Sequence, residues 1–171
     1  MIESGATQLS IEAVDPEEIV ASAVTRIGPV AEQRSLNVRR LPGVASDVRV
    51  LADPDRLGRA LLNLAHNAVK YSHPGGEVRL GWAVGPETVR FEVSDDGIGV
   101  PEAHQARIFE RFYKVDRSRA RAREQQPLSG SAGLGLAIVR HIAEAHRGSV
   151  GLTSAEGSGS TFWIELPRAL D

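Results

Sequence analysis

Residues 61–71 read LLNLAHNAVKY. This stretch has the apolar residues of a helix with one buried face, and it also contains two asparagines and a lysine. The apolar residues recur at helical spacing, while Asn63, Asn67 and Lys70 fall at i, i+4 and i+7 and therefore share one stripe of the helix. Asparagine is a poor helix former, so two of them one turn apart bring the helix no obvious stability. The stripe is either a solvated face or a binding face, and this segment alone favours neither.

The composition excludes several classes of function. The chain has 171 residues, of which 42% are hydrophobic and 25% charged, with a formal net charge of -2. This length allows one domain with a real core. The charge is not concentrated in a basic region, so nucleic acid is not indicated as the main ligand. The chain has no cysteine, which excludes disulfides, zinc–thiolate sites and cysteine nucleophiles. Its only lysines are Lys70 and Lys114, so each needs an explanation.

Cap and turn signals place further elements before this stretch and around it. Asp15 with Pro16, and Asp53 with Pro54, each combine an N-cap with a proline in the first turn. They predict one helix that runs to about residue 34 and a second that ends at HPGG, residues 73–76. Three segments are typical of short strands: residues 9–15, 36–41 and 48–52, the last two around a turn at residues 42–43.

The second half of the chain alternates strands with one more helix. Residues 77–84 and 88–93 alternate cleanly between apolar and polar residues and predict an antiparallel hairpin through Gly85 and Pro86. A glycine-rich loop and the start of a short helix follow, and residues 117–131 lack periodicity, as is typical of a mobile loop. A helix over residues 133–146 and strands at 148–155 and 160–167 complete the pattern. It predicts an α+β sandwich with three long helices on one face of a mixed sheet.

Two glycine-containing segments are candidates for nucleotide binding, although each is weak evidence alone. In VSDDGIGVP, residues 93–101, Asp95 follows a strand end and could accept a hydrogen bond from an exocyclic amine such as that of adenine. An ordinary Asp-Gly turn is the alternative. In GSAGLGLAIV, residues 130–139, glycines lead into a helix N-terminus, which favours phosphate. This segment is neither a Walker A loop nor a dinucleotide fingerprint, and no protein-kinase signature occurs.

Together and in this order, the segments resemble the catalytic ATP-binding domain of bacterial two-component sensor histidine kinases, members of the GHKL superfamily. The N box corresponds to residues 63–71, the first glycine box to 95–99, the F box to 108–113 and the second glycine box to 133–136. EGSGSTFWIELP, residues 156–167, resembles the closing turn and last strand. The resemblance implies a Bergerat-type two-layer α/β sandwich with a mobile ATP lid at about residues 116–132. It also implies that residues 1–8 end a linker from a dimerisation hairpin and that 9–171 form the catalytic domain.

The resemblance assigns roles to the polar stripe of the N box. Asn67 would hold Mg²⁺ on the phosphates of ATP, with Asn63 beside it, because a neutral amide oxygen suits this hard cation. Lys70 would lie on the phosphates as a point charge. Tyr71 would pack near the base or ribose. On this interpretation the stripe faces nucleotide and metal rather than bulk water.

The remaining boxes supply the other nucleotide contacts that the resemblance implies. Asp95 would accept a hydrogen bond from the adenine amine, and Gly97 and Gly99 would leave room for the ring. Further contacts are expected from the F box, the second glycine box and the last strand, at Arg111, Lys114, Gly133, Leu134, Gly135, Leu136 and Thr161.

Two positions depart from the family's pattern, and a third distinguishes branches of the superfamily. Ala132 stands where a small hydroxyl residue usually precedes Gly133, and Asp96 stands where asparagine is common and adds a charge near the base. At Asn63, topoisomerases and mismatch-repair ATPases of similar fold carry a glutamate that activates water. Asparagine cannot act as a general base, so no catalytic base is assigned, and Asn63 and Lys70 would support transfer to a nucleophile supplied from elsewhere.

Histidine is such a nucleophile, because its neutral nitrogen needs little activation at pH 7. The family's acceptor lies in a His-Glu/Asp-x-x-x-Pro helix of the dimerisation hairpin. None of this chain's five histidines has that context, and all five are expected to be structural or solvent-exposed: His66, His73, His104, His141 and His146.

The sequence therefore predicts a protein-histidine kinase catalytic domain that binds Mg-ATP and transfers the γ-phosphate to a histidine on a hairpin outside this chain. By itself the fragment should be inactive in autophosphorylation, monomeric and cytoplasmic, with a parent kinase anchored in the membrane. Its partners would be the hairpin and, indirectly, a response regulator. Two alternatives stay open: a degenerate nucleotide-binding regulatory module, suggested by Ala132, and a topoisomerase-like ATP hydrolase, which Asn63 disfavours.

Overall fold

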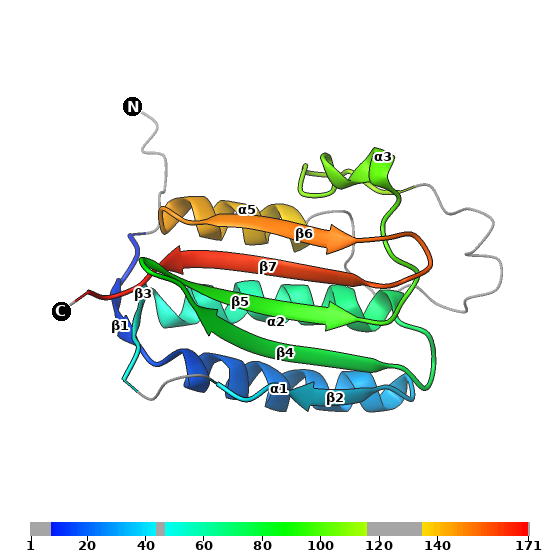
Figure 1. Cartoon of the computed structure of the whole chain (residues 1–171), viewed down its shortest axis with the longest axis horizontal. Helices are drawn as coiled ribbons and strands as arrows, with labels where there is room; N and C mark the ends of the chain where they lie inside the picture. The colour runs from blue at the N-terminus through cyan, green and yellow to red at the C-terminus, as the bar shows by residue number, and fades with distance from the viewer. Residues whose placement is uncertain (1–7, 44–46, 116–134, 171) are drawn as a thin grey trace.

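The computed structural model describes residues 8–43, 47–115 and 135–170 (Figure 1). Within these ranges the chain forms two sheets and several helices. The helices are α1 (Pro16–Gln33), α2 (Pro54–Tyr71), α3 (Glu102–Gln105) and α5 (Gly135–Ala145). The strands are β1 (Glu12–Val14), β2 (Asn37–Arg40), β3 (Val50–Ala52), β4 (Glu77–Val84), β5 (Thr88–Asp95), β6 (Ser149–Ser154) and β7 (Ser160–Pro167). This element order confirms the predicted α+β class.

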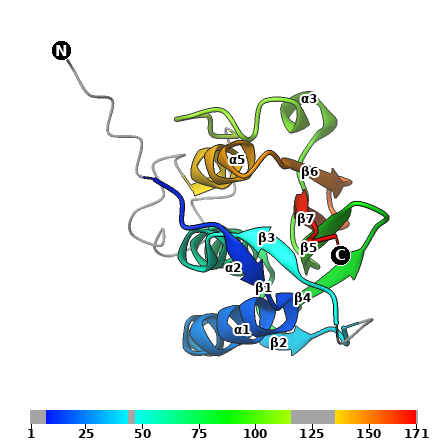
Figure 2. The ribbon, with the colours of Figure 1, turned by 90° about the vertical axis from the view of Figure 1, so that its left-hand side faces the viewer.

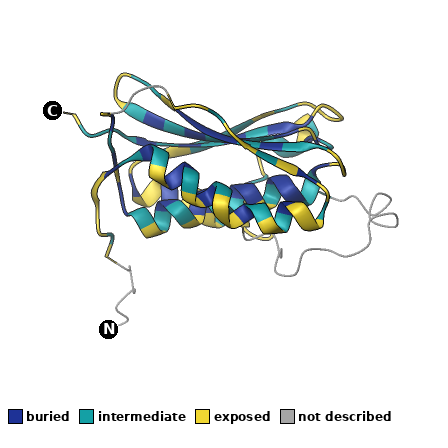
Figure 3. Ribbon diagram, turned by 90° about the horizontal axis from the view of Figure 1, so that it is seen from below, coloured by how far each residue is buried: buried dark blue, intermediate teal, exposed yellow. Residues whose placement is uncertain are grey.

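The main sheet has five strands in the order β2-β4-β5-β7-β6, and it is mixed because β2 pairs with β4 in parallel while the other neighbours are antiparallel. Helices α1, α2 and α5 all pack on one face of it (Figure 2). The sides of the helices that face the sheet are buried, as Figure 3 shows. Alternation along β5 turns Val89, Phe91 and Val93 into this core. The predicted two-layer sandwich is therefore confirmed.

The two predicted helix starts are capped as expected. The Asp15 carboxylate accepts a hydrogen bond from the Glu17 N–H at 2.9 Å. The Asp53 carboxylate accepts from the N–H groups of Asp55 and Arg56 at 3.1 and 3.2 Å. Because both helices also begin with proline, their first residues match the prediction.

The strands on either side of residues 42–43 do not pair with each other. β2 lies at the edge of the main sheet, whereas β3 pairs with β1 in a separate two-stranded antiparallel sheet. The connection is held against the sheet, since a Cβ on Gly43 would lie within 3 Å of the Trp82 ring and the Glu17 carboxylate. The Trp82 indole N–H donates to Glu17 Oε2 at 2.8 Å and fixes that contact.

In the described residues between β5 and residue 115, the chain forms a single helical turn, α3, and then a series of turns. Phe109 is buried there, with its ring packed edge-on against Phe162 at 6.1 Å between centroids. The predicted lid at 116–132 and the first two residues of the second glycine box, Gly133 and Leu134, lie outside the described residues. Among the helices that the structure describes, none is long and apolar enough to cross a membrane.

Candidate functional site

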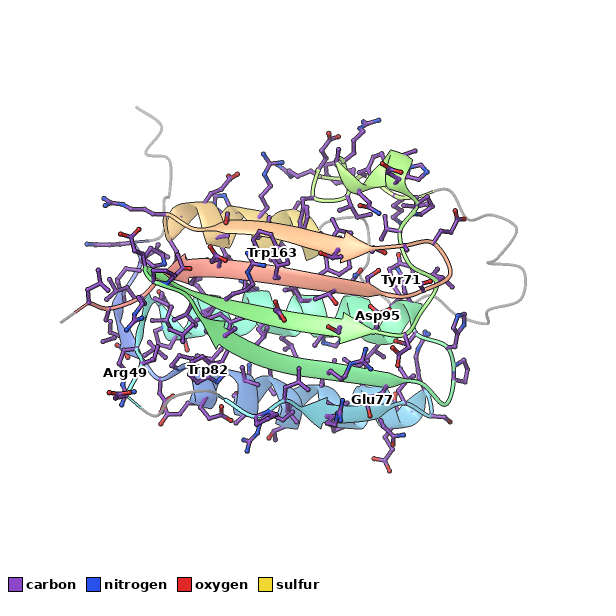
Figure 4. The ribbon with its side chains drawn as sticks, in the orientation of Figure 1. Arg49, Tyr71, Glu77, Trp82, Asp95 and Trp163 are labelled. Carbon is purple, nitrogen blue, oxygen red and sulfur yellow. The ribbon has the colours of Figure 1, made fainter. Side chains whose placement is uncertain are left out.

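The end of the N box, at Tyr71, and the first glycine box meet at one end of the sheet. Helix α2 and strand β5 both end there, and β7 begins there (Figure 4). The loop after β5 contacts the end of α2 directly, because the Ile98 N–H donates to the Tyr71 carbonyl at 3.3 Å. The structure thus brings Tyr71 and Asp95, far apart in sequence, to the same corner.

Asp95 is a buried carboxylate at the last position of β5, with 5% of its surface exposed. Its Oδ1 accepts a hydrogen bond from the Gly97 N–H at 2.9 Å. Burial raises the pKa of Asp95 to about 6, and the negative charge of Asp96 adds to the rise. Backbone hydrogen bonds from Gly97 and Ser160 and the positive charge of Arg79 oppose it. A carboxylate has acceptor capacity beyond these bonds, so Asp95 can read an N–H group of a ligand.

The two glycines of this loop are required by backbone packing. A Cβ on Gly97 would lie 2.1 Å from the Tyr71 carbonyl oxygen. Gly99 has a φ of +70°, and a Cβ there would lie 2.1 Å from the Ala155 carbonyl oxygen. The structure therefore explains both glycines by contacts within the protein, and the room for an adenine ring that the resemblance implies stays a prediction.

The charge of Asp96, which the sequence analysis places near the base, is paired within the protein. Its carboxylate accepts two hydrogen bonds from the Arg79 guanidinium, at 2.9 and 3.0 Å. These bonds lower the pKa of Asp96, so the pair stays ionised at neutral pH. An aspartate in place of asparagine thus adds an ion pair between β4 and the loop after β5, residues 96–100, which we call the glycine loop.

The polar stripe of α2 lies outside the core, with the other side of the helix against the sheet. Asn63, Asn67 and Lys70 are all half-buried. The Asn63 side-chain amide makes a long hydrogen bond of 3.5 Å to the carbonyl of Gly135, the first residue of α5. The Lys70 ammonium lies 5.2 Å from the centroid of the Tyr71 ring. The stripe is therefore bordered by the start of α5 and by Tyr71.

The donor set around the stripe fits Mg²⁺ only together with a phosphate ligand. Among the described residues, no group of three His, Cys, Asp or Glu side chains could hold a metal ion. Asn67 offers one neutral amide oxygen. Mg²⁺ is bound in this way in many nucleotide sites, because it keeps several waters and takes its remaining ligands from phosphate oxygens.

The F box has one buried aromatic residue, Phe109, and several exposed side chains after it. Arg111 and Lys114, the predicted phosphate contacts, are exposed, and the Arg111 guanidinium lies 5.2 Å from the Phe112 ring centroid. Phe112 itself is 63% exposed and has a φ of +63°. A positive φ is strained for a bulky side chain, so this exposed phenylalanine is a candidate for a functional surface.

In the last strand, the residue directly beside Asp95 is Ser160, and the nucleotide contact expected of its neighbour Thr161 stays a prediction. Thr161 lies on the sheet face away from the helices, where its hydroxyl is 2.9 Å from that of Ser94. Ser160 is buried and directly opposite Asp95 in the antiparallel register. The sequence analysis missed Ser160, although pairing the two alternating strands at residues 88–93 and 160–167 would have pointed to it.

The second glycine box is described only from Gly135 onward, where Gly135 and Leu136 begin α5. A Cβ on Gly135 would have nothing within 4 Å. Packing among the described residues therefore does not require glycine at this position.

The histidines behave as expected from the sequence. His146 is buried, with Nδ1 2.7 Å from the Ile142 carbonyl and Nε2 accepting from the Asp53 N–H at 3.0 Å. His104 forms a hydrogen bond with the Tyr113 hydroxyl. The other three are exposed: His66, His73 and His141. The prediction that all five are structural or solvent-exposed is confirmed.

Comparison with known proteins gives a consistent result. Residues 52–170 match the family described as histidine kinase-, DNA gyrase B-, and HSP90-like ATPase. The sensor-like histidine kinase SenX3 of Mycolicibacterium smegmatis is 38% identical over 168 residues, which are 98% of this chain and 42% of that protein. The chain thus spans about two fifths of the length of this curated relative.

Two solved structures extend the match to the fold. Full-length ShkA in complex with AMPPNP has a TM-score of 0.79 at 34% identity, over 97% of this chain and 33% of that one. The mycobacterial sensor histidine kinase MprB has a TM-score of 0.72 at 28% identity, over 94% of this chain and 99% of that one. The chain therefore belongs to the family of histidine kinase-, DNA gyrase B-, and HSP90-like ATPases, as an ATP-binding domain of the sensor histidine kinases.

Proposed function

We propose that this domain binds Mg-ATP along α2 and transfers the γ-phosphate to a histidine on a dimerisation hairpin of the same kinase. The observation that carries the proposal is the buried Asp95 carboxylate, held at the corner where the polar stripe of α2 ends. A response regulator would then receive the phosphoryl group from that histidine.

Asp95 would select the base. Adenine carries an amine at the position where guanine carries a carbonyl oxygen, and a carboxylate can accept from the first but repels the second. Because Asp95 is buried, a base without this donor would leave the carboxylate's remaining acceptor capacity unused and would bring two oxygens together, so the site should discriminate strongly.

The phosphates would lie along the stripe of α2. A helix rises 1.5 Å per residue, so Asn67 lies about 6 Å and Asn63 about 12 Å along the axis from Tyr71. A nucleotide with its base at Asp95 would therefore place its phosphates beside Lys70 and Asn67. A bound Mg²⁺ would neutralise charge on these phosphates, with Asn67 as its one protein ligand among the described residues.

The site suits transfer to a nucleophile from outside the chain. Asn63 cannot take a proton from water. The histidines of the described ranges are buried, hydrogen-bonded or exposed, and none lies in the His-Glu/Asp-x-x-x-Pro sequence of the family's acceptor. We propose Phe112 as part of the surface that meets the hairpin, because its exposed ring is held at a strained backbone conformation.

The test is transfer in trans. The chain is incubated with radiolabelled ATP and a separately produced dimerisation hairpin of its parent kinase. We expect an acid-labile, alkali-stable label on the hairpin, none on the chain alone, and a rate that rises with hairpin concentration. Phe112→Ala should lower this rate with ATP affinity unchanged.

Four results would contradict the proposal. Self-labelling of the chain, or an acid-stable product on serine or threonine, would exclude histidine transfer as assigned. Rapid phosphate release without the hairpin would favour the ATP hydrolase, and no binding of any nucleotide would favour the regulatory module.

A further inference from the structure

The glycine loop that follows Asp95, residues 96–100, is supported from outside the N, F and glycine boxes, by the turn between β6 and β7. The Gly157 N–H of this turn donates to the Ile98 carbonyl at 2.8 Å. On the other side of the contact, a Cβ on Gly159 would lie 2.1 Å from the Asp95 carbonyl oxygen. The two backbones therefore touch without intervening side chains, and the turn fixes where the loop can lie.

Ser154, the last residue of β6, is the centre of this contact. Its hydroxyl accepts from the Val100 N–H at 2.7 Å and donates to the Gly159 carbonyl at 2.9 Å. It is also 2.8 Å from the Ser160 hydroxyl. A serine hydroxyl has one proton and two lone pairs, so with its proton on Gly159 it accepts from both Val100 and Ser160. Its hydrogen-bonding capacity is then fully used.

Gln105, the last residue of α3, closes the same contact from a third element. Its side-chain amide donates to the Val100 carbonyl at 2.9 Å and to the Ser154 carbonyl at 3.0 Å. The amide thus donates one hydrogen bond to the glycine loop and one to β6, and it connects the two. No residue of α3 is itself buried, so the Gln105 amide is an anchor of this short helix.

The contact leads directly to the base-reading group. Ser160, bonded to Ser154, is the register partner of Asp95, and its backbone N–H donates to the Asp95 carboxylate. Val100, bonded to both Ser154 and Gln105, lies in the loop whose Gly97 N–H holds Asp95 Oδ1. Both backbone donors to the Asp95 carboxylate are therefore positioned by this network.

We propose that Ser154 and Gln105 are positioning residues for adenine recognition: they hold the Asp95 carboxylate where it meets the base, without touching the nucleotide. The inference rests on the proposed function, in that it takes Asp95 as the acceptor of the adenine amine. It assigns roles to two side chains that lie outside the N, F and glycine boxes.

The test compares a ligand that has adenine with one that has only phosphates. Affinities for ATP and for inorganic tripolyphosphate, both with Mg²⁺, are measured by calorimetry for Ser154→Ala, Gln105→Met and the unaltered chain. We expect ATP affinity to fall about tenfold in each variant and tripolyphosphate affinity to stay unchanged. GTP affinity should also stay unchanged, so that the preference for ATP over GTP narrows.

Matched variants separate positioning from general damage. Ser154→Thr keeps the hydroxyl and should restore ATP affinity, and Ser158→Ala alters an exposed serine of the same turn and should have no effect. An unchanged ATP affinity in Ser154→Ala and Gln105→Met would overturn the inference. So would an equal loss for ATP and tripolyphosphate, because that pattern marks a structural role. Failure of the unaltered chain to bind ATP would instead overturn the proposed function itself.

Discussion

The Arg79 guanidinium and the Asp96 carboxylate form a bidentate pair that joins β4 to the glycine loop, with N–O distances of 2.9 and 3.0 Å. The pair stands immediately beside Asp95 and acts on it in opposite directions. The negative charge of Asp96 raises the pKa of Asp95, and the positive charge of Arg79 lowers it. Burial is the larger cause and brings that pKa to about 6.

Adenine nucleotide affinity should therefore fall in mildly acidic solution. The Asp95 carboxylate accepts the adenine amine only when ionised, and with a pKa of about 6 its ionised fraction falls about tenfold between pH 7 and pH 5. We expect a similar loss of ATP affinity, measured by calorimetry. Tripolyphosphate measured over the same range corrects for titration of the phosphates. An equal pH dependence for both ligands would remove Asp95 from the base site.

The Arg79 and Asp96 side chains should shift this pH dependence in opposite directions. Asp96→Asn removes a charge that raises the pKa of Asp95, so the midpoint of the affinity curve should move to lower pH. Arg79→Gln removes a charge that lowers it, so the midpoint should move to higher pH. Arg90→Gln breaks an ion pair with Glu165 farther along β5 and is the matched control. Midpoints that move together in both variants would show an indirect effect.

Asp95→Asn should stabilise the domain and abolish adenine binding. In the folded state the pKa of Asp95 is raised from 3.8 to about 6, so its contribution to stability is present below pH 4 and is lost as pH rises through 6. Removing the charge should raise the free energy of unfolding at pH 7 by roughly 2–3 kcal/mol, with no gain at pH 3.5. Urea denaturation at both pH values measures this, and a loss of stability at pH 7 would contradict it.

Asn67→Ala should weaken ATP binding mainly when Mg²⁺ is present. The amide oxygen of Asn67 is the one metal ligand proposed within the described residues, so its loss should lower affinity about tenfold with Mg²⁺ and much less with EDTA. His66→Ala, at the exposed neighbouring position of α2, is the control. An equal loss under both conditions would mean that Asn67 acts on the structure and not on the metal.

His146→Ala should destabilise the fold without a direct effect on nucleotide contacts. The ring joins the end of α5 to the start of α2, because Nε2 accepts from the Asp53 N–H and Nδ1 lies against the Ile142 carbonyl. Leaving the buried Asp53 N–H without its partner should cost about 1–3 kcal/mol. Thermal unfolding against His141→Ala, an exposed histidine of the same helix, measures the difference. A melting temperature equal to that of the control would contradict this role.

Much of the fold could be predicted because the signals that determine it are local. Helix α2 begins at an aspartate cap with a following proline, and it ends before HPGG, so both ends are set by residues within one turn of them. The β4–β5 hairpin follows from two alternating segments and a short turn. The stripe of Asn63, Asn67 and Lys70 is also a local fact, since helical spacing alone puts the three on one side.

The tertiary structure decided what depends on pairing between distant segments. Alternation shows that β2 and β3 are strands but not which strand each one joins, and it is long-range packing that sends them to different sheets. The same holds at the site: a shift of register by one residue exchanges the two faces of a strand, so only the pairing of β5 with β7 places Ser160, and not Thr161, beside Asp95. The raised pKa of Asp95, the pairing of Asp96 with Arg79 and the support from Ser154 and Gln105 all arise from that packing, because burial and charge proximity are properties of neighbours in space rather than in sequence.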